Sequence, residues 1–454
     1  MGGRPEMTKI ITPFRGLSTR RQFLTGTAAA AAGLGLYGAG FRPAFADLAA
    51  AGDWKKFEGT NLRMLLNNHW WTDAVKARVA SFEEMTGMKV TLDILSEDNY
   101  YQKAAVELSA GTGNYDGLMV GNLQAGQYMA AGWLAPLTDL INGAVSPEWY
   151  QIDDIFASGR EAGSIGGVLQ ALPISTEAQV VMYRKDLLEA AGLGPIRTFD
   201  ELEAAAKAMN KDGVAGIVGR GRRGLDVVWV WTGFFLGYGG NFLVDGVPAV
   251  DSEAGIKATE LYINRLLRDN GPQGTANMSW LEAIGVFKEG KAALYPDASG
   301  LVPVAIDKET NANADQVGVF AWPAAEGQKP APNYWFWLFG IPAASKNQEA
   351  AALFTAWATS PEVSLEIGQE TGSPVARASV WANEGFKKFY PGDMAGEIAQ
   401  NLANVQAARV PYGDPRFPNA ADALSVELVN VLTGSKDAAT AMKDANAAMI
   451  AAME

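Results

Sequence analysis

The hydrophobic pattern begins with three short apolar runs separated by helical patterns. Residues 61–66, 89–95 and 115–120 predict strands, because they are short, apolar and bounded by polar or glycine-rich segments. The segment between the first two runs carries apolar residues at helical spacing, and residues 99–110 predict a second helix. This alternation is typical of an α/β fold with a parallel sheet. Ligands of such sheets bind beyond the carboxyl ends of the strands, which points to the loops that follow the three runs.

The middle of the chain continues this mixture of strands and helices. Residues 167–173 predict a small strand that enters a turn at Pro173, and residues 174–183 predict an extended segment. A helix is expected after Thr198, where Glu201 completes a capping box. An aromatic helical segment, a hairpin, further helices and two strands follow at these positions: 229–238, 242–250, 252–269, 278–287, 290–295 and 317–322.

An aromatic stretch, Tyr334–Phe339, stands out as a further strand. Strand alternation sends Tyr334 and Phe336 to one face and Trp335 and Trp337 to the other. One interpretation is a strand buried on both sides of an α/β sheet. The other is a strand that packs on one face and binds a ligand on the other. Beyond it, the chain is predicted to be helical to its end, apart from a turn at 372–377.

Composition narrows the function classes. The 454 residues suggest two domain-sized units. A net charge of −13 argues against nucleic acid as a partner, because a phosphate backbone requires a basic face. The chain has no cysteine and a single histidine, His69, so thiolate chemistry is excluded and a histidine-rich metal site is not expected. No metal and no cofactor are predicted. Carboxylate-only chemistry, such as glycoside hydrolysis, stays open.

One glycine pattern is set aside. Gly219-x-Gly221-x-x-Gly224 matches the spacing of a dinucleotide-binding loop. Arginines fill the variable positions, and no acidic residue follows a strand at the required distance. Spacing alone is a weak signal, so we do not interpret it as a nucleotide site.

The N-terminal segment has the features of an export signal. Arg20-Arg21 precedes an alanine- and glycine-rich apolar run, which ends at Ala44-Phe45-Ala46. This order is typical of a twin-arginine signal peptide with a small-x-small cleavage site, and it argues against a transmembrane anchor. We therefore expect residues 1–46 to be removed. We expect a periplasmic protein without a membrane anchor, exported already folded.

Four motifs carry a resemblance to a known family. They are Leu172-Pro173 with Gln179, Tyr183 and Lys185-Asp186-Leu187-Leu188; Phe287-Lys288-Glu289-Gly290-Lys291-Ala292-Ala293-Leu294; Gly340-Ile341-Pro342-Ala343-Ala344-Ser345-Lys346-Asn347 with Ala350-Ala351; and Gly372-Ser373-Pro374-Val375-Ala376-Arg377. In this order and spacing, across roughly residues 60–450, the chain resembles the carbohydrate-binding, maltose-binding-like class of extracellular solute-binding proteins of ABC importers.

The resemblance implies a periplasmic-binding-protein fold. Two α/β lobes, joined by a multi-strand hinge, would enclose a ligand cleft. Residues 57–174 and 337–395 would form one lobe, and residues 175–336 and 396–454 the other. The implied partners are a small carbohydrate or polyol and the transmembrane subunits of an ABC permease. A monomer is expected, with no nucleic acid. In this arrangement the aromatic stretch would cross between the lobes.

Sugars and polyols require aromatic planes for their C–H faces and polar side chains for their hydroxyl groups. The candidates lie at strand ends, at the proposed crossovers and in the turn: Asn68, His69, Trp70, Asp98, Asn122, Gln124, Thr176, Glu177, Trp229, Asp297, Ser299, Trp335, Trp337 and Arg377.

Several of these residues, and some of their neighbours, have plainer interpretations. Asp98 is also a candidate helix N-cap, and Arg377 could pair with an acidic residue across the lobes. Trp71, Trp231 and Trp357 are expected in the core, and Asp116 is expected to cap or order its turn. Arg222 and Arg223 are expected in a solvated loop, although they could meet an anionic sugar.

Two other functions remain open from the sequence. One is a secreted glycoside hydrolase that uses two carboxylates, for example Glu177 with Asp297. The other is a binding protein for a polyamine or another cation, held by acidic and aromatic residues.

Overall fold

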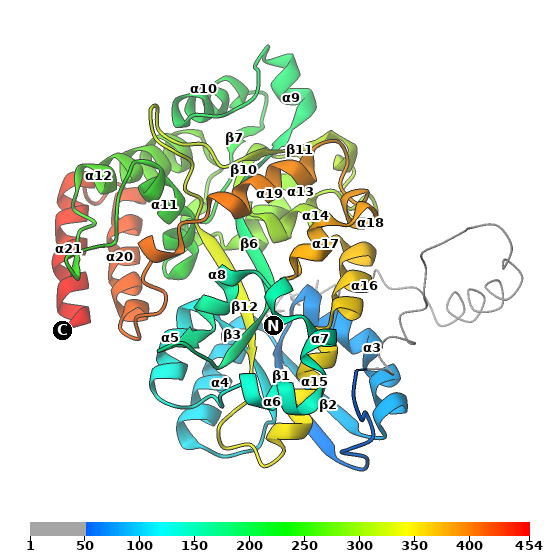
Figure 1. Ribbon diagram of the computed structural model, residues 1–454. Coiled ribbons are helices and arrows are strands. Elements are labelled where there is room, and N and C mark those ends of the chain that lie inside the picture. Colours follow the sequence, from blue (N-terminus) through cyan, green and yellow to red (C-terminus); the bar gives the residue numbers. More distant parts are fainter. Residues whose placement is uncertain (1–50) are drawn as a thin grey trace, which may run out of the picture. The chain divides into compact units, whose positions relative to one another are not determined.

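The computed structural model describes residues 51–454, so the predicted signal peptide lies outside the described residues. Its strands build an eight-stranded sheet in the order β2-β1-β3-β12-β6-β10-β7, with β11 also paired to β6 (Figure 1). These strands are β1 (Asn61–Asn67), β2 (Lys89–Leu95), β3 (Gly117–Gly121), β6 (Ala171–Arg184), β7 (Ala215–Ile217), β10 (Ala292–Ala298), β11 (Val317–Ala321) and β12 (Tyr334–Gly340). Two small hairpins are β4 (Ser164–Ile165) with β5 (Val168–Leu169), and β8 (Leu243–Val244) with β9 (Val247–Pro248).

Helices fill the segments between and after the strands. Up to β6 they are α3 (Trp70–Thr86), α4 (Glu97–Ala110), α5 (Asn122–Ala130), α6 (Thr138–Ala144), α7 (Pro147–Tyr150) and α8 (Ala157–Ala162). Between β6 and β12 they are α9 (Lys185–Ala190), α10 (Phe199–Met209), α11 (Leu225–Gly237), α12 (Glu253–Thr259), α13 (Trp280–Lys288) and α14 (Val302–Ala305), with a π-helical segment, η2 (Glu260–Arg268), after α12. After β12 they are α15 (Gln348–Ala358), α16 (Pro361–Thr371), α17 (Ala378–Ala382), α18 (Glu384–Lys387), α19 (Met394–Asn404), α20 (Phe417–Leu432) and α21 (Ala438–Met453).

The predicted β-α-β-α-β unit is confirmed. β1 pairs in parallel with β2 along its whole length and with β3 at Met64 and Leu65. The connecting helix α3 ends at Gly87, whose φ of 71° is the left-handed conformation that glycine adopts without steric strain. The carboxyl ends of β1, β2 and β3 therefore meet at one edge of the sheet.

The long strand β6 corrects one expectation. A turn was predicted at Pro173, but the strand continues through this residue to Arg184. The proline is tolerated because the register between β6 and β12 shifts there: Trp337 pairs with Ser175 and Leu338 pairs with Pro173, which leaves Ile174 as an extra residue. Residues 171–173 of the predicted strand and the extended segment are thus one element, whereas residues 168–169 belong to β5.

β6 changes its hydrogen-bonding partners along its length. Residues 171–178 pair with β12, whereas Gln179 and the residues after it pair with β10 and β11. In Figure 1, β6 runs from the neighbourhood of β1, β3 and β12 toward β10 and β7. A single strand therefore ties the two sets of strands together.

The aromatic strand β12 is antiparallel to both β3 and β6, and all seven of its residues are buried. The ring centroids of Tyr334 and Phe336 lie 4.8 Å apart, and those of Trp335 and Trp337 lie 6.0 Å apart. Both aromatic faces predicted from alternation are therefore present. Burial along the whole strand agrees with the interpretation of a strand buried on both sides. Whether either face binds a ligand depends on the residues that neighbour it.

The remaining packing follows the predicted pattern. Thr198 and Glu201 form the expected capping box of α10, and α20 and α21 pack against each other at the end of the chain. Trp231 and Trp357 are core residues, as expected.

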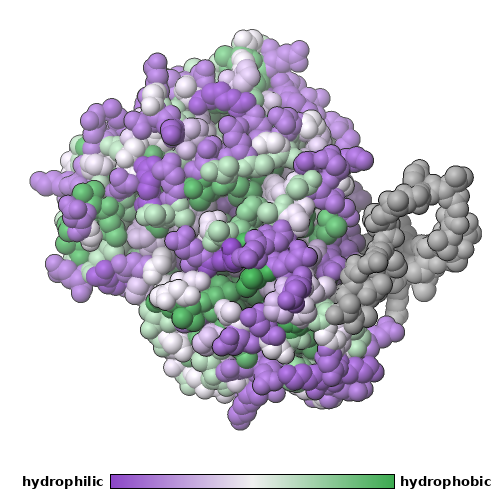
Figure 2. Space-filling model, in the orientation of Figure 1, coloured by the Kyte–Doolittle hydropathy of each residue, from purple (hydrophilic) through white to green (hydrophobic). Residues whose placement is uncertain are grey.

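The face in view in Figure 2 is mainly hydrophilic, with hydrophobic residues gathered in a few places. Among residues 51–454, no helix is both long and apolar enough to cross a membrane.

Asp116, predicted to order its turn, connects two segments that are far apart in the sequence. Its carboxylate accepts hydrogen bonds from the backbone N–H of Arg63 (3.0 Å), the hydroxyl of Ser345 (2.7 Å) and the amide of Asn347 (3.2 Å). The group is buried, so each of these donors would lose its partner if the carboxylate were removed.

We expect Asp116→Ala to lower the free energy of unfolding by about 2–4 kcal/mol, because three donors lose a charged acceptor. Chemical denaturation measures this change. Glu326→Ala, at an exposed loop position, is the control and should change stability little. Equal stability of the two variants would contradict the proposed role of Asp116.

Candidate ligand-binding site

The site is built where the first three strands end. His69 follows β1 and caps α3: its Nδ1 accepts the backbone N–H of Trp71 at 3.3 Å. The remaining ring proton therefore sits on Nε2. Burial lowers the pKa of His69 to about 3, so the imidazole is neutral near pH 7. Its ring lies 5.6 Å from that of Trp337 on β12.

Several buried polar atoms at this edge make no hydrogen bond within the described part of the chain. Asn122, the first residue of α5, is 1% exposed, and neither its Oδ1 nor its Nδ2 has a partner. Gln124 Oε1 and Trp70 Nε1 are likewise buried without a hydrogen-bond partner. Buried polar groups in proteins are nearly always paired, so such a group calls for an explanation. A ligand that supplies the missing partners is one.

The aromatic face of β12 lies beside these atoms. The Trp337 ring stacks on Tyr101 from α4, with centroids 5.9 Å apart and planes 11° apart. Gly121, paired with Trp337, permits this close approach. A Cβ there would lie 2.8 Å from Gln124 Oε1, 2.9 Å from Trp335 and 3.0 Å from the Tyr101 hydroxyl. Gly121 thus lies between the unpaired Gln124 oxygen and the Trp335 ring.

Glu177 lies on β6 directly opposite Trp335. Its carboxylate lies 4.0 Å from His69 Nε2. Burial raises the pKa of Glu177 to about 7; Arg220 opposes this shift, and the charges of Asp297 and Glu97 add to it. The side chain of Trp70 also lowers this pKa, as a hydrogen-bond donor in reach of Glu177. Glu177 is thus a buried carboxylate whose neighbouring donors, Trp70 and His69, are both neutral.

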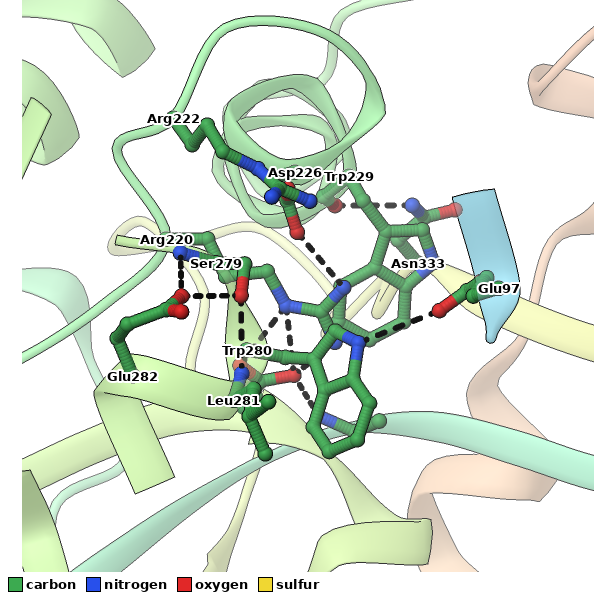
Figure 3. Close-up of polar contacts among 12 residues, drawn as sticks. Glu97, Arg220, Arg222, Asp226, Trp229, Ser279, Trp280, Leu281, Glu282 and Asn333 are labelled. Carbon is green, nitrogen blue, oxygen red and sulfur yellow. Dashed lines mark hydrogen bonds and ion pairs between the residues drawn. The ribbon is translucent and has the colours of Figure 1, made fainter. Parts of the chain in front are cut away.

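Arg220 shows the opposite situation. Its guanidinium donates through Nε and Nη2 to both carboxylate oxygens of Asp297, which is fully buried. Its Nη1 lies 3.7 Å from Asp226, and its plane lies over the Trp229 ring at 4.7 Å (Figure 3). Burial alone would lower the pKa of Arg220, but the charges of Asp297 and Asp226 raise it. This arginine is therefore fully engaged by the protein.

Glu97, at the start of α4, links residues that are distant in the sequence. Its carboxylate accepts a hydrogen bond from the Tyr101 hydroxyl at 3.3 Å. It also accepts one from the Trp280 indole N–H at 3.4 Å (Figure 3). Trp280 begins α13, 183 positions further along the chain. Burial raises the pKa of Glu97, while Arg220 lowers it and Asp226 raises it again. Both of its donors are neutral groups.

The predicted residues divide into those that the structure gathers and those that it places elsewhere. His69, Glu177, Trp335 and Trp337 lie together, and Gln124 meets Trp335. Asn122 and Trp70 adjoin them in the sequence and carry unpaired atoms.

Other candidates have partners within the protein. Asp297 is held by Arg220, and the Trp229 indole N–H donates to the Tyr334 carbonyl oxygen. The Ser299 hydroxyl accepts the backbone N–H of Ala178.

Three candidates lie away from the cluster of His69, Glu177, Trp335 and Trp337. Arg377 donates to the backbone carbonyls of Thr359, Gln151 and Tyr150 and pairs with Asp154. Its acidic partner thus belongs to the same proposed lobe, and not to the other lobe as expected. Asn68 is exposed, and Thr176 pairs with Phe336 on the opposite face from Glu177.

The side chain of Asp98 lies outside the described residues. Its backbone lies inside α4, whose N-cap is Ser96, so the N-cap interpretation of Asp98 is wrong. Among the described residues, no group of three or more histidine and acidic side chains is placed to hold a metal ion.

The sequence interpretation missed five residues around the site: Glu97, Tyr101, Arg220, Trp280 and Tyr412. Glu97 and Tyr101 follow β2 in the segment that strand order had already indicated, so they could have been found. Arg220 lies within the glycine pattern, two positions before Arg222. Arg222 was expected in a solvated loop but pairs with Asp226. Nothing local marked Trp280 or Tyr412, whose neighbours come from distant segments.

Comparison with known proteins shows the family of this chain. The family described as bacterial extracellular solute-binding protein matches residues 68–364. The mannitol-binding protein of Pseudomonas aeruginosa is 30% identical over 299 residues, which cover 64% of this chain and 67% of that protein.

Two solved solute-binding proteins of ABC transporters share the fold. The one from Agrobacterium radiobacter K84, in complex with ribitol, is 25% identical with a TM-score of 0.78 and covers 86% of this chain and 98% of its own. The one from Agrobacterium vitis S4, with bound D-mannitol, is 27% identical with a TM-score of 0.77 and covers 86% and 97%. This chain belongs to the family of bacterial extracellular solute-binding proteins.

Proposed function

We propose that this protein is the solute-binding component of an ABC importer and that it captures a polyol or sugar for a membrane permease. The observation that carries the proposal is Asn122, a fully buried amide with two unpaired polar atoms at the carboxyl end of β3. An amide offers both a donor and an acceptor, which is what a hydroxyl group requires. The mannitol- and ribitol-binding relatives support a linear polyol as the ligand.

The other groups suit the same chemistry. Gln124 Oε1 is a buried acceptor without a donor and Glu177 is a buried carboxylate, and the hydroxyl groups of a polyol supply donors for both. The Trp335 and Trp337 rings offer apolar planes for the C–H side of the ligand. His69 is neutral and carries its proton on Nε2, so it adds a donor without adding a charge.

We propose that the two lobes comprise residues 57–174 with 337–395 and residues 175–336 with 396–454. The change of partner along β6 after Ala178, close to the first of these boundaries, supports this division. The hydrogen bond between Glu97 and Trp280 would then join the lobes in the closed form. Ligand would stabilise that form through contacts made only when the lobes meet.

We also propose that the protein reaches the periplasm by the twin-arginine route and performs no chemistry there. The support for export is the order of Arg20-Arg21, the apolar run and Ala44-Phe45-Ala46. Against a two-carboxylate hydrolase stands the engagement of Asp297, whose two oxygens are both bound by Arg220. The pair Glu177 and Asp297 is thus not free to act as acid and nucleophile.

A thermal-shift screen with D-mannitol, ribitol and maltose, followed by calorimetry and chromatography of the ligand, tests the proposal. Ligand that binds only the folded state raises the melting temperature and is recovered unchanged. Absence of stabilisation by every polyol and sugar would contradict the ligand class. Recovery of a cleaved ligand would contradict the absence of chemistry.

We expect Asn122→Ala to weaken the binding of the best polyol about tenfold or more, because the ligand loses the hydrogen bonds of the amide. The melting temperature without ligand should be unchanged or slightly raised, since the buried amide has no partner to lose. Asn142→Ala, at an exposed position of α6, is the control and should change neither value. A full loss of stability with unchanged affinity would show that Asn122 is purely structural.

Comparing Trp337 with Trp357 distinguishes a tryptophan that stacks on the ligand from one that packs in the core. Trp357 is a core residue whose ring lies 4.9 Å from that of Phe82, so Trp357→Ala should cost about 3–5 kcal/mol of stability and leave the affinity of the folded protein unchanged. Trp337→Ala should weaken affinity more than tenfold, because the ligand loses an aromatic plane. Calorimetry on folded protein measures both, and equal affinities in the two variants would refute stacking on Trp337.

His69 is the chain's single histidine, so its NMR signal needs no assignment. With its pKa lowered to about 3 by burial, the ring should show no titration between pH 5 and 8. The unfolded chain binds a proton at its ordinary pKa near 6.5, so stability should fall as the pH drops below that value. A midpoint near 6.5 in the folded protein would contradict a neutral, buried His69.

A further inference from the structure

The charges at the proposed site do not balance. Asp297 is neutralised by Arg220, and Asp226 by Arg222 and Arg220. The carboxylates of Glu97 and Glu177 remain, and each raises the electrostatic cost of charging the other, since the charge of Glu97 raises the pKa of Glu177. The site thus carries two acidic groups without a dedicated cation.

The nearest cation is not available to a ligand. Arg220 directs Nε and Nη2 at Asp297, approaches Asp226 with Nη1, and covers the Trp229 ring with its plane. A carboxylate brought by a ligand would therefore find no free guanidinium. It would also face Glu177, which is 8% exposed and only weakly hydrated.

The groups that contact the two carboxylates are neutral. Glu97 receives hydrogen bonds from Tyr101 and Trp280. Glu177 is 4.0 Å from the Nε2 of the neutral His69, and its other neighbouring donor is the neutral indole N–H of Trp70. The unpaired amide of Asn122 at the same sheet edge points independently to a ligand in this place.

The aromatic rings complete this arrangement. Tyr101 donates to Glu97 and stacks on Trp337, whose ring is 5.6 Å from His69; His69 in turn faces Glu177. A chain of direct contacts thus leads from one carboxylate to the other along the Trp337 ring. Aromatic faces attract cations, and most strongly where water is excluded.

Building on the proposed function, we propose that Glu97 and Glu177 form a charge-selective subsite for an ammonium group carried on a polyhydroxylated ligand. An amino polyol binds more tightly than the neutral polyol of the same chain length, and the corresponding acid is rejected. The hydroxyl groups remain necessary, because Asn122 and Gln124 require hydrogen-bonding partners that an ammonium group alone does not supply.

Calorimetry on a matched series tests this proposal at pH 7.5 and constant ionic strength. The series consists of the polyol that stabilises the protein most, its 1-amino-1-deoxy analogue and its aldonate. We expect the amine to bind at least tenfold more tightly than the polyol and the aldonate at least 100-fold more weakly. An aldonate within threefold of the polyol, or an amine weaker than the polyol, would overturn the proposal.

Isosteric variants identify the responsible groups. Glu177→Gln and Glu97→Gln remove one charge each while keeping shape, and each should reduce the preference for the amine and the discrimination against the aldonate at least fivefold. Glu84→Gln, at an exposed position of α3, should leave both ratios unchanged. Unchanged ratios in both site variants, with melting temperatures confirming folded protein, would overturn the assignment.

Two further outcomes separate this proposal from the proposed function. Spermidine carries cations but no hydroxyl groups, and it should bind more weakly than the amino polyol; tighter binding would identify a polyamine site and overturn the proposal. If no polyol binds, the proposed function itself fails. If the neutral polyol binds but the affinities of the amine and the aldonate do not differ from it in the expected directions, only the proposed charge selectivity is wrong.

Discussion

The hydrogen bonding of β6 to two different sets of strands is the constraint on which the rest of the structure depends. Residues up to Ala178 pair with β12, and those from Gln179 pair with β10 and β11. The Gln179 side chain reinforces the change of partner: it accepts the backbone N–H of Asn333 at 2.8 Å and donates to the carbonyl oxygen of Trp229 at 3.1 Å. Glu177 lies two residues before this point, opposite Trp335. The least satisfied carboxylate of the site therefore sits where the two sets of strands are joined.

A contrast between paired and unpaired buried groups then defines the site. Arg220 and Asp297 are buried together and satisfy each other in a bidentate pair, so removing either would leave an uncompensated charge. Asn122 is buried with both polar atoms of its side chain unpaired, at a cost of about 1–3 kcal/mol for each unsatisfied group, and Glu177 is buried without a cation of its own. A ligand that satisfies them recovers this free energy. The same groups that weaken the empty protein would thus provide affinity for a polyol.

Local patterns were sufficient to predict much of the fold. The parallel unit of β1, β2 and β3, the capping box at Thr198 and the aromatic strand β12 follow from apolar periodicity and cap residues. Pro173 misled, because a proline inside a strand is tolerated only with a register shift that the sequence does not display. The strand-end rule located His69, Asn122 and Gln124, while Arg377 matched a family motif and proved to hold loops together. Trp280 was not predicted because its contact with Glu97 depends on tertiary folding alone.

The most direct test of the account is a crystal structure of the protein with D-mannitol or ribitol bound. The account predicts ligand oxygens within hydrogen-bonding distance of the Asn122 amide and the Glu177 carboxylate, with the carbon chain against the Trp337 ring. The Arg220 and Asp297 pair should remain intact. A ligand bound elsewhere, with the Asn122 amide and the Glu177 carboxylate still unpaired, would contradict the account.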